Sequence, residues 1–229
     1  MINIKKIKID SADKNLVDIS FKIENSTALI GESGSGKSLT LKALLNLLPK
    51  NFNVEKDISS NFELNYDNIG FIPQNPFTSL SQMTKIKNQF FCTKEKKEQL
   101  FELLNLNLDI LNKYPSQISG GQTQRVVIAM ALSKDAKILL LDEPTTALDE
   151  ENKTNIINII KELQNRLKIK ILFVTHDINS IKDICEDIVI LKDGKIVESG
   201  KTKQILENPK DSYTKKLINS TFENKEFRK

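Results

Sequence analysis

The sequence lacks long apolar runs, which argues against a protein with membrane-spanning helices. A membrane-spanning helix needs about 20 consecutive apolar residues, and no stretch of this 229-residue chain comes near that length. The opening residues MINIKKIKID also lack the apolar core of a signal peptide. We therefore expect a cytosolic protein that does not itself cross a membrane.

Cysteine and histidine are scarce, which argues against a disulfide framework and a zinc site. The two cysteines, Cys92 and Cys185, are far apart and share no Cys-x-x-Cys or Cys/His spacing. Neither charge sign dominates, because 34 basic residues face 30 acidic ones for a net charge of +4. This balance does not indicate a nucleic-acid partner. Hydrophobic residues make up 39% of the chain, enough for the core of one globular domain.

The pattern of apolar residues predicts an α/β fold. Alternation over residues 2–9 and 16–24 predicts two antiparallel edge strands joined by the polar turn DSADKN. Apolar runs that alternate with helical patterns predict a mainly parallel sheet with helices on both faces. The expected strands are 27–31, 68–73, 137–142, 170–175 and 187–193, and the expected helices are 38–48, 119–133, 151–168 and one near 178–185.

The middle of the chain has a different pattern. Residues 78–114 are rich in Lys, Gln, Leu and Phe without strand alternation, which predicts an inserted helical subdomain. A further strand is expected near FELNY, residues 62–66.

Glycine is also rare, yet three of the eight glycines lie in GESGSGKS, residues 31–38. This stretch fits G-x-x-x-x-G-K-[ST] and lies between a predicted strand and a predicted helix, as that motif requires. Glycines let the backbone turn its N–H groups into a concavity, and a helix N-terminus favours an anion. The motif predicts a polyphosphate site in which Lys37 reaches the β- and γ-phosphates and the Ser38 hydroxyl binds Mg²⁺. A merely flexible turn would not need Lys-Ser at this offset.

Two acids end the predicted strand in KILLLDEP, residues 137–144. Carboxylates beside a buried strand are costly to desolvate unless they face a metal or a polar cleft. We therefore expect Asp142 on the Mg²⁺ side of the nucleotide and Glu143 as the group that polarises the attacking water.

A second glycine-rich helix start, SGGQ, occupies residues 119–122. It offers another phosphate-ready helix N-terminus, although one nucleotide does not need two. The second loop makes sense if it completes the site of another subunit. A kinase that binds its nucleotide through the GESGSGKS loop is a further possible reading, but such an enzyme would not need SGGQ.

The order of GESGSGKS, ISGGQTQR, LLLDEP and VTHD resembles the ATP-binding cassette of ABC transporters over nearly the whole chain. The resemblance implies one ABC ATPase domain over 1–229, with a nucleotide-binding core of 1–76 and 134–229 and a helical signature subdomain of about 77–133. It implies ATP and Mg²⁺ as cofactors. The implied nucleotide-binding residues are Gly31, Glu32, Ser33, Gly34, Ser35, Gly36, Lys37, Ser38, Leu39, Ser119, Gly120, Gly121, Gln122 and Asp149.

Three further positions acquire roles from the resemblance. Gln74 in FIPQNP resembles the Q-loop glutamine, which contacts Mg²⁺ and the attacking water and links the core to the helical subdomain. Asp149 in TTALDEE resembles the D-loop aspartate, which communicates across a dimer. His176, the only histidine, lies where the family has its switch histidine. The implied catalytic residues are thus Glu143, His176 and Gln74, and the implied metal ligands are Ser38, Gln74 and Asp142.

A finer resemblance comes from QNPFTSLSQMTKI and YPSQISGGQ, which are similar to the peptide and nickel importer branch. It implies an ATP-hydrolysing motor subunit on the cytoplasmic face of the membrane, held there by two permease subunits and served by a solute-binding protein. The second ATPase subunit is either a non-identical paralogue or a second copy of this chain. The short length resembles the nickel-import subunits more than the peptide-import ones.

The alternative function is a soluble ABC ATPase that acts on nucleic acid or ribosomes. Such proteins carry a long coiled coil or two cassettes in one chain, and this sequence shows neither, so no nucleic-acid partner is expected. Two departures from the family remain. The turn DSADKN has no aromatic residue to stack on adenine, and IENSTALIG lacks the glycine that usually precedes the P-loop strand.

Overall fold

The computed structural model describes residues 1–12, 14–146 and 148–226, with side chains described through residue 220. The chain divides into two compact units. The first combines Met1–Leu64 with the segment from Lys170 onward, and the second is Asn65–Ile169. The signature subdomain expected at about 77–133 stays a prediction.

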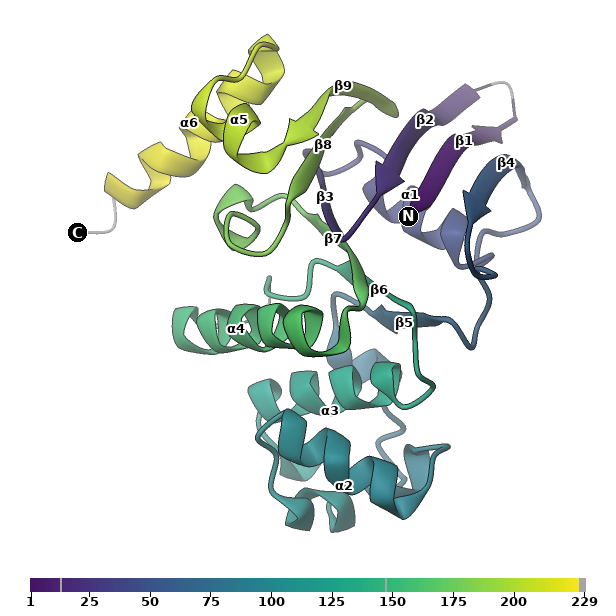
Figure 1. Ribbon diagram of the computed structural model, residues 1–229, viewed down its shortest axis with the longest axis vertical. Helices are drawn as coiled ribbons and strands as arrows, with labels where there is room; N and C mark the ends of the chain where they lie inside the picture. Colours follow the sequence, from purple (N-terminus) through teal and green to yellow (C-terminus); the bar gives the residue numbers. More distant parts are fainter. Residues whose placement is uncertain (13, 147, 227–229) are drawn as a thin grey trace. The chain divides into compact units, whose positions relative to one another are not determined.

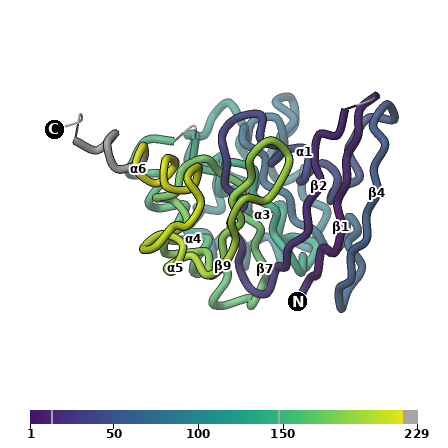
Figure 2. Tube along the Cα trace, turned by 90° about the horizontal axis from the view of Figure 1, so that it is seen from above, coloured from purple at the N-terminus to yellow at the C-terminus, as the bar shows by residue number. Residues whose placement is uncertain are grey.

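An antiparallel sheet opens the first unit, with strand order β2 (Lys14–Ile23), β1 (Ile2–Ser11) and β4 (Phe52–Ser60). Figure 2 shows the three strands side by side. The isoleucines of β1 alternate inward and are fully buried, which confirms the predicted antiparallel edge.

The strand predicted near 62–66 is wrong, because the third strand is β4 and ends at Ser60. Ser60 pairs with Ile2, where β1 begins, so β1 does not extend far enough to pair with residues 62–66. The sequence of β4 does not look like a strand, because it contains the charged residues Glu55 and Asp57. These residues lie on an exposed sheet edge and pair with lysines of β1.

The other strands of the first unit begin with a parallel set. β3 (Ser26–Ile30) lies between β7 (Lys170–Thr175) and β8 (Asp187–Lys192), and all five of its residues are buried. β8 turns back through Asp193 and Gly194 into the antiparallel β9 (Lys195–Lys201), which leads to α5 (Thr202–Glu207) and α6 (Ser212–Glu226) (Figure 1). The helix predicted near 178–185 is only a 3-10 turn at Ile178–Ser180, whose start the Asp177 side chain caps.

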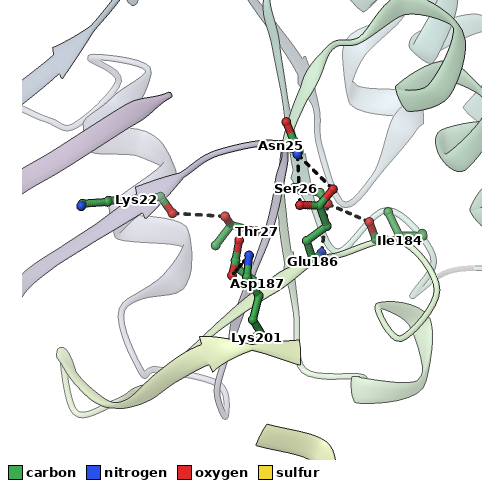
Figure 3. A network of polar contacts seen from close by, with 8 residues as sticks. All are labelled: Lys22, Asn25, Ser26, Thr27, Ile184, Glu186, Asp187 and Lys201. Atoms are coloured by element: carbon green, nitrogen blue, oxygen red, sulfur yellow. Dashed lines mark hydrogen bonds and ion pairs between the residues drawn. The ribbon is translucent and has the colours of Figure 1, made fainter. Parts of the chain in front are cut away.

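A polar network anchors the start of β3 to β8 (Figure 3). The Asn25 amide donates to both carboxylate oxygens of Glu186 at 3.0 Å. The Ser26 hydroxyl donates to the Ile184 carbonyl at 2.8 Å and accepts from the Glu186 N–H at 3.0 Å. These side chains bind the turn where the family usually has a glycine, so the strand that leads into the glycine loop is fixed at its far end.

The second unit pairs β5 (Ile69–Ile72) in parallel with β6 (Ile138–Asp142). α3 (Gly120–Leu132) lies against β5 at Gly70, where a Cβ atom would stand 2.8 Å from the Ala131 carbonyl oxygen. α2 (Lys94–Leu103) packs beside α3, and α4 (Glu150–Leu167) completes the unit. Parallel pairing in both units, with helices and an antiparallel edge, confirms the predicted α/β fold.

Regular helix covers less of residues 78–114 than the sequence predicts. Only α2 is an α-helix there. The other helical pieces are three 3-10 turns, at Pro76–Ser79, Ile86–Gln89 and Leu108–Asn112, and a further 3-10 turn follows at Pro115–Gln117. Capping side chains such as Asn75 and Asn107 and the prolines begin new turns every few residues, so none extends. Among the helices that the structure describes, none combines the length and apolar character needed to cross a membrane.

Candidate nucleotide-binding site

The glycine loop Gly31–Ser38 connects β3 to α1 (Lys37–Leu44) with a backbone that demands glycine. Gly34 and Gly36 have φ angles of +83° and +106°, the left-handed region that other residues rarely adopt. Gly31 is required for space, because a Cβ there would lie 2.2 Å from the Leu191 carbonyl oxygen. The loop is therefore a preformed concavity at the start of a helix.

Lys37 lies inside this loop. Its side chain is 5% exposed, and its Nζ donates to the carbonyl oxygens of Gly31 at 2.7 Å and Glu32 at 2.9 Å. Ser38, on the first turn of α1, is exposed. The loop thus holds a buried ammonium and an exposed hydroxyl next to a helix N-terminus, where anions are favoured.

His176 emerges at the same sheet edge as the glycine loop. Ile30 of β3 is paired with Thr175 of β7, so Gly31 and His176 follow neighbouring positions in parallel strands. His176 is exposed, and the next residues are ordered by a hydrogen bond from the Asp177 N–H to the Thr175 hydroxyl, 3.0 Å. The predicted switch histidine is thus presented at the edge where the P-loop begins.

In the second unit, Gln74 and Glu143 come together. Each follows, by two residues, the paired positions Ile72 and Leu141 of parallel strands. The Gln74 amide donates to the Glu143 carboxylate at 3.4 Å, and the Thr146 hydroxyl donates to the same oxygen at 3.0 Å. Glu143 has a φ of +47°, and backbone strain of this kind collects at functional sites. Asp142, one residue earlier, is half-buried at the end of β6.

The signature residues form the N-terminus of α3. The Ser119 hydroxyl accepts from the Gln122 N–H at 3.2 Å, and the Gln122 side chain accepts from the Ser119 N–H at 3.0 Å, a reciprocal capping box. Gly120 is exposed and has open space where a side chain would stand. Gly121 is buried, and a Cβ there would lie 2.5 Å from the Asn152 amide oxygen.

Asp149 caps α4 and fixes Asn152 in the same contact. Its carboxylate accepts from the Asn152 N–H at 2.8 Å and from the Asn152 amide nitrogen at 2.9 and 3.1 Å. The backbone hydrogen bond from Asn152 lowers the pKa of the Asp149 carboxyl. Asp149 therefore reaches the signature loop indirectly, through Asn152 against Gly121.

Sequence reasoning missed Thr146 and Asn152. A Thr three residues after Glu143, and an Asn three residues after an Asp that caps a helix, are weak local signals of these contacts. Asp13, in the turn that lacks an aromatic residue, lies outside the described residues. Among the residues that the structure describes, no group of three or more His, Cys, Asp or Glu side chains could hold a metal ion.

The strand, glycine loop and helix of β3 and α1 define a P-loop nucleotide-binding fold. A family model described as ABC transporter matches residues 15–146, which include the glycine loop, the signature residues and Glu143. The chain belongs to the ABC transporter family, as its motifs predicted, and it is an ATP-binding ATPase of that family.

Relatives and a solved structure agree with this assignment. The dipeptide transport ATP-binding protein DppD of Caldanaerobacter subterraneus is 36% identical over 95% of this chain and 74% of its own length. The methionine import ATP-binding protein MetN of Lactobacillus acidophilus is 32% identical over 97% of this chain and 71% of its own. The ATP-binding cassette MJ0796, solved as a dimer with ADP and Pi, has a TM-score of 0.70 at 26% identity and covers 88% of this chain and 99% of its own.

Proposed function

We propose that the chain is the motor subunit of a peptide importer and drives uptake through two separate membrane-spanning subunits. The relatives DppD and MetN carry names of dipeptide transport and methionine import, which supports a peptide or amino-acid solute more than nickel. The observation that carries the motor role is the buried Lys37 ammonium inside a loop that depends on glycine for its left-handed backbone at Gly34 and Gly36.

In this proposal the nucleotide phosphates occupy the glycine loop. Lys37 binds the β- and γ-phosphates, and the N–H groups at the start of α1 bind the remaining charge. Mg²⁺ would neutralise charge on the transferred phosphoryl group. Its proposed ligands are the Ser38 hydroxyl, the Asp142 carboxylate and the Gln74 amide oxygen. All three are oxygen donors, which this ion prefers, and Mg²⁺ commonly binds through one or two carboxylates together with substrate phosphates.

Glu143 is the proposed general base. Its carboxylate orients the attacking water and takes its proton, while Thr146 and Gln74 hold the carboxylate in place through the hydrogen bonds at 3.0 and 3.4 Å. His176 is the proposed partner of the γ-phosphate at the edge where the P-loop begins. These roles follow the family motifs residue by residue.

The signature loop is proposed to act on the nucleotide of a second ATPase subunit. Gly120 is exposed at the N-terminus of α3, as a loop that meets a partner requires. The dimeric structure of MJ0796 supports a paired arrangement. The partner is either an unlike paralogue or a second copy of this chain. Asp149 would link the signature loop to the partner through its contact with Asn152, which lies against Gly121.

Membrane subunits are proposed to bind beside Gln74. Met83, nine residues after Gln74, is 89% exposed, and Phe77 is 42% exposed. The buried Gln89 side chain fixes this loop. Its amide oxygen accepts from the Ser81 N–H at 2.8 Å, and its amide nitrogen donates to the carbonyl oxygens of Ser81 at 3.0 Å and Thr84 at 2.7 Å. A fixed loop with an exposed apolar tip suits a binding partner. The chain would then lie peripherally on the cytoplasmic face.

Capture of the tagged chain from detergent-solubilised membranes of its own cell tests this function. We expect two multi-span membrane proteins to be recovered in constant ratio with the chain, and fewer with Met83→Asp. Exposed Leu108→Asp serves as the matched control. Recovery of ribosomes or DNA in place of membrane proteins would support the alternative function instead.

A further inference from the structure

The C-terminal helix α6 reaches the glycine loop through one side chain. The phenol oxygen of Tyr213 accepts a hydrogen bond from the Glu32 N–H at 3.0 Å. Tyr213 is 8% exposed, so water competes little for this contact. Its role lies outside every motif of the nucleotide site.

One peptide group connects Tyr213 to Lys37. The peptide between Gly31 and Glu32 presents its carbonyl oxygen to the Lys37 Nζ at 2.7 Å and its N–H to Tyr213. Because a peptide group is planar and rigid, its two ends move together. Hydrogen bonds in series also strengthen one another. The position of Tyr213 therefore bears directly on the lysine that we assign to the phosphates.

Tyr213 is itself held in place from several sides. Its N–H donates to the Asp211 carboxylate at 2.8 Å. Glu198 of β9 accepts from the N–H groups of Lys210 and Asp211 at 2.9 and 3.1 Å, which binds the start of α6 to the sheet. The Lys192 ammonium lies 5.1 Å from the Tyr213 ring centroid. These contacts make the phenol oxygen a fixed acceptor.

A second contact holds the other end of the loop. The Gly194 N–H, in the turn between β8 and β9, donates to the Ser35 carbonyl at 3.0 Å. The sheet hairpin thus fixes Ser35 by a backbone contact, and Tyr213 of α6 fixes Glu32 by a side chain. A side-chain contact is the one of the two that a substitution removes cleanly.

We propose that Tyr213 is a positioning residue that couples α6 to nucleotide binding. The inference rests on the phosphate-binding role proposed for Lys37. To bind phosphates, Lys37 exchanges its Gly31 carbonyl partner for the ligand, and Tyr213 keeps the Gly31–Glu32 peptide in position during the exchange. Without the phenol oxygen, the ligand must order this peptide itself, and affinity falls. By linkage, bound nucleotide stabilises the contact of α6 with the loop.

Substitution Tyr213→Phe tests the inference, because it removes the acceptor and keeps the ring. Dissociation constants for a fluorescent ATP analogue are measured on the full chain, together with KM and kcat for ATP. A hydrogen bond of this kind corresponds to a loss of about 2- to 10-fold in affinity. We expect Tyr213→Phe to raise KM by more than it lowers kcat. The control Tyr66→Phe, at a tyrosine that is 75% exposed in the other unit, should bind as the wild type does.

Hydrogen exchange gives a readout that a purely structural role would not move. The analogue should slow amide exchange at the start of α6 in the wild type and much less in Tyr213→Phe. Equal affinity of Tyr213→Phe and the wild type, with Lys37→Ala unable to bind, would overturn the inference and leave the role of Lys37 intact. A lower melting temperature with unchanged affinity would overturn it as well. Normal binding by Lys37→Ala would overturn both roles.

Discussion

Glu143 combines a left-handed backbone, φ +47°, with a carboxylate held by Thr146 and Gln74. A glutamate in that conformation costs free energy. The parallel strands β5 and β6 end just before Gln74 and Glu143, and the left-handed backbone at Glu143 is found where its carboxylate meets the Gln74 amide. This geometry suits a group whose direction matters more than its contribution to stability.

Glu143→Gln should bind ATP and fail to hydrolyse it. The amide keeps the shape and loses the proton acceptor, and general-base catalysis is worth about 10²- to 10⁴-fold. Single-turnover hydrolysis and nucleotide binding are measured in parallel. The control Thr146→Val should slow hydrolysis less, since it removes only one orienting hydrogen bond. Hydrolysis by Glu143→Gln at the wild-type rate would remove Glu143 from the mechanism.

Asp149 gives stability that depends on pH. Hydrogen bonding from Asn152 lowers the pKa of the Asp149 carboxyl, so the ionised carboxylate stabilises the folded state at neutral pH. That contribution is lost as the pH falls through the lowered pKa, below about 4. The melting temperature of the wild type should exceed that of Asp149→Asn at pH 7, and the difference should shrink as the pH falls below about 4. A difference that grows on acidification would contradict this assignment.

At the scale of elements, buried strands were predictable and polar edges were not. Continuous apolar runs identified β3, β6 and β7, because strands covered on both faces leave no room for polar residues. β4 and β9 are exposed for much of their length, so their sequences have no such run. The contacts made by Asn152 and Tyr213 join residues that are distant in sequence or carry no motif, and only folding brings them to their partners.

The contact between α3 and α4 explains why the two signature glycines differ. Gly121 faces Asn152, which Asp149 holds by three hydrogen bonds, whereas Gly120 faces open space. Gly121→Ala should destabilise the fold by about 1–3 kcal/mol, as overpacking does. Gly120→Ala should cost nothing, because alanine favours a helix by about 1 kcal/mol over glycine. Chemical denaturation measures both.

A compensating substitution completes that test. Asn152→Ala removes the amide oxygen that the new Cβ would strike, so the double variant Gly121→Ala, Asn152→Ala should lose less stability than the two single changes added together. Additive losses of stability would mean that the Asn152 side chain is not what prevents a larger residue at position 121.

At the scale of the whole molecule, the proposal that two chains share each nucleotide site rests on two helix N-termini suited to phosphate. Where the chain pairs with itself, mixing Ser119→Arg chains with Lys37→Ala chains should restore part of the ATP hydrolysis that each variant lacks alone. The mixed dimer contains one site with an intact glycine loop and an intact signature loop. A demonstrated mixed dimer without activity would mean that Ser119 does not act on the partner's nucleotide.

ATP-driven uptake by the complete assembly tests the proposed function most directly. The chain is reconstituted in vesicles with the two membrane subunits recovered by capture, and uptake of a labelled dipeptide is followed together with ATP hydrolysis. We predict that the two rise together with the wild type and that both are lost with Glu143→Gln. Dipeptide uptake at the same rate with Glu143→Gln, or ATP hydrolysis that never depends on the membrane subunits, would contradict the assignment of this chain as an importer motor.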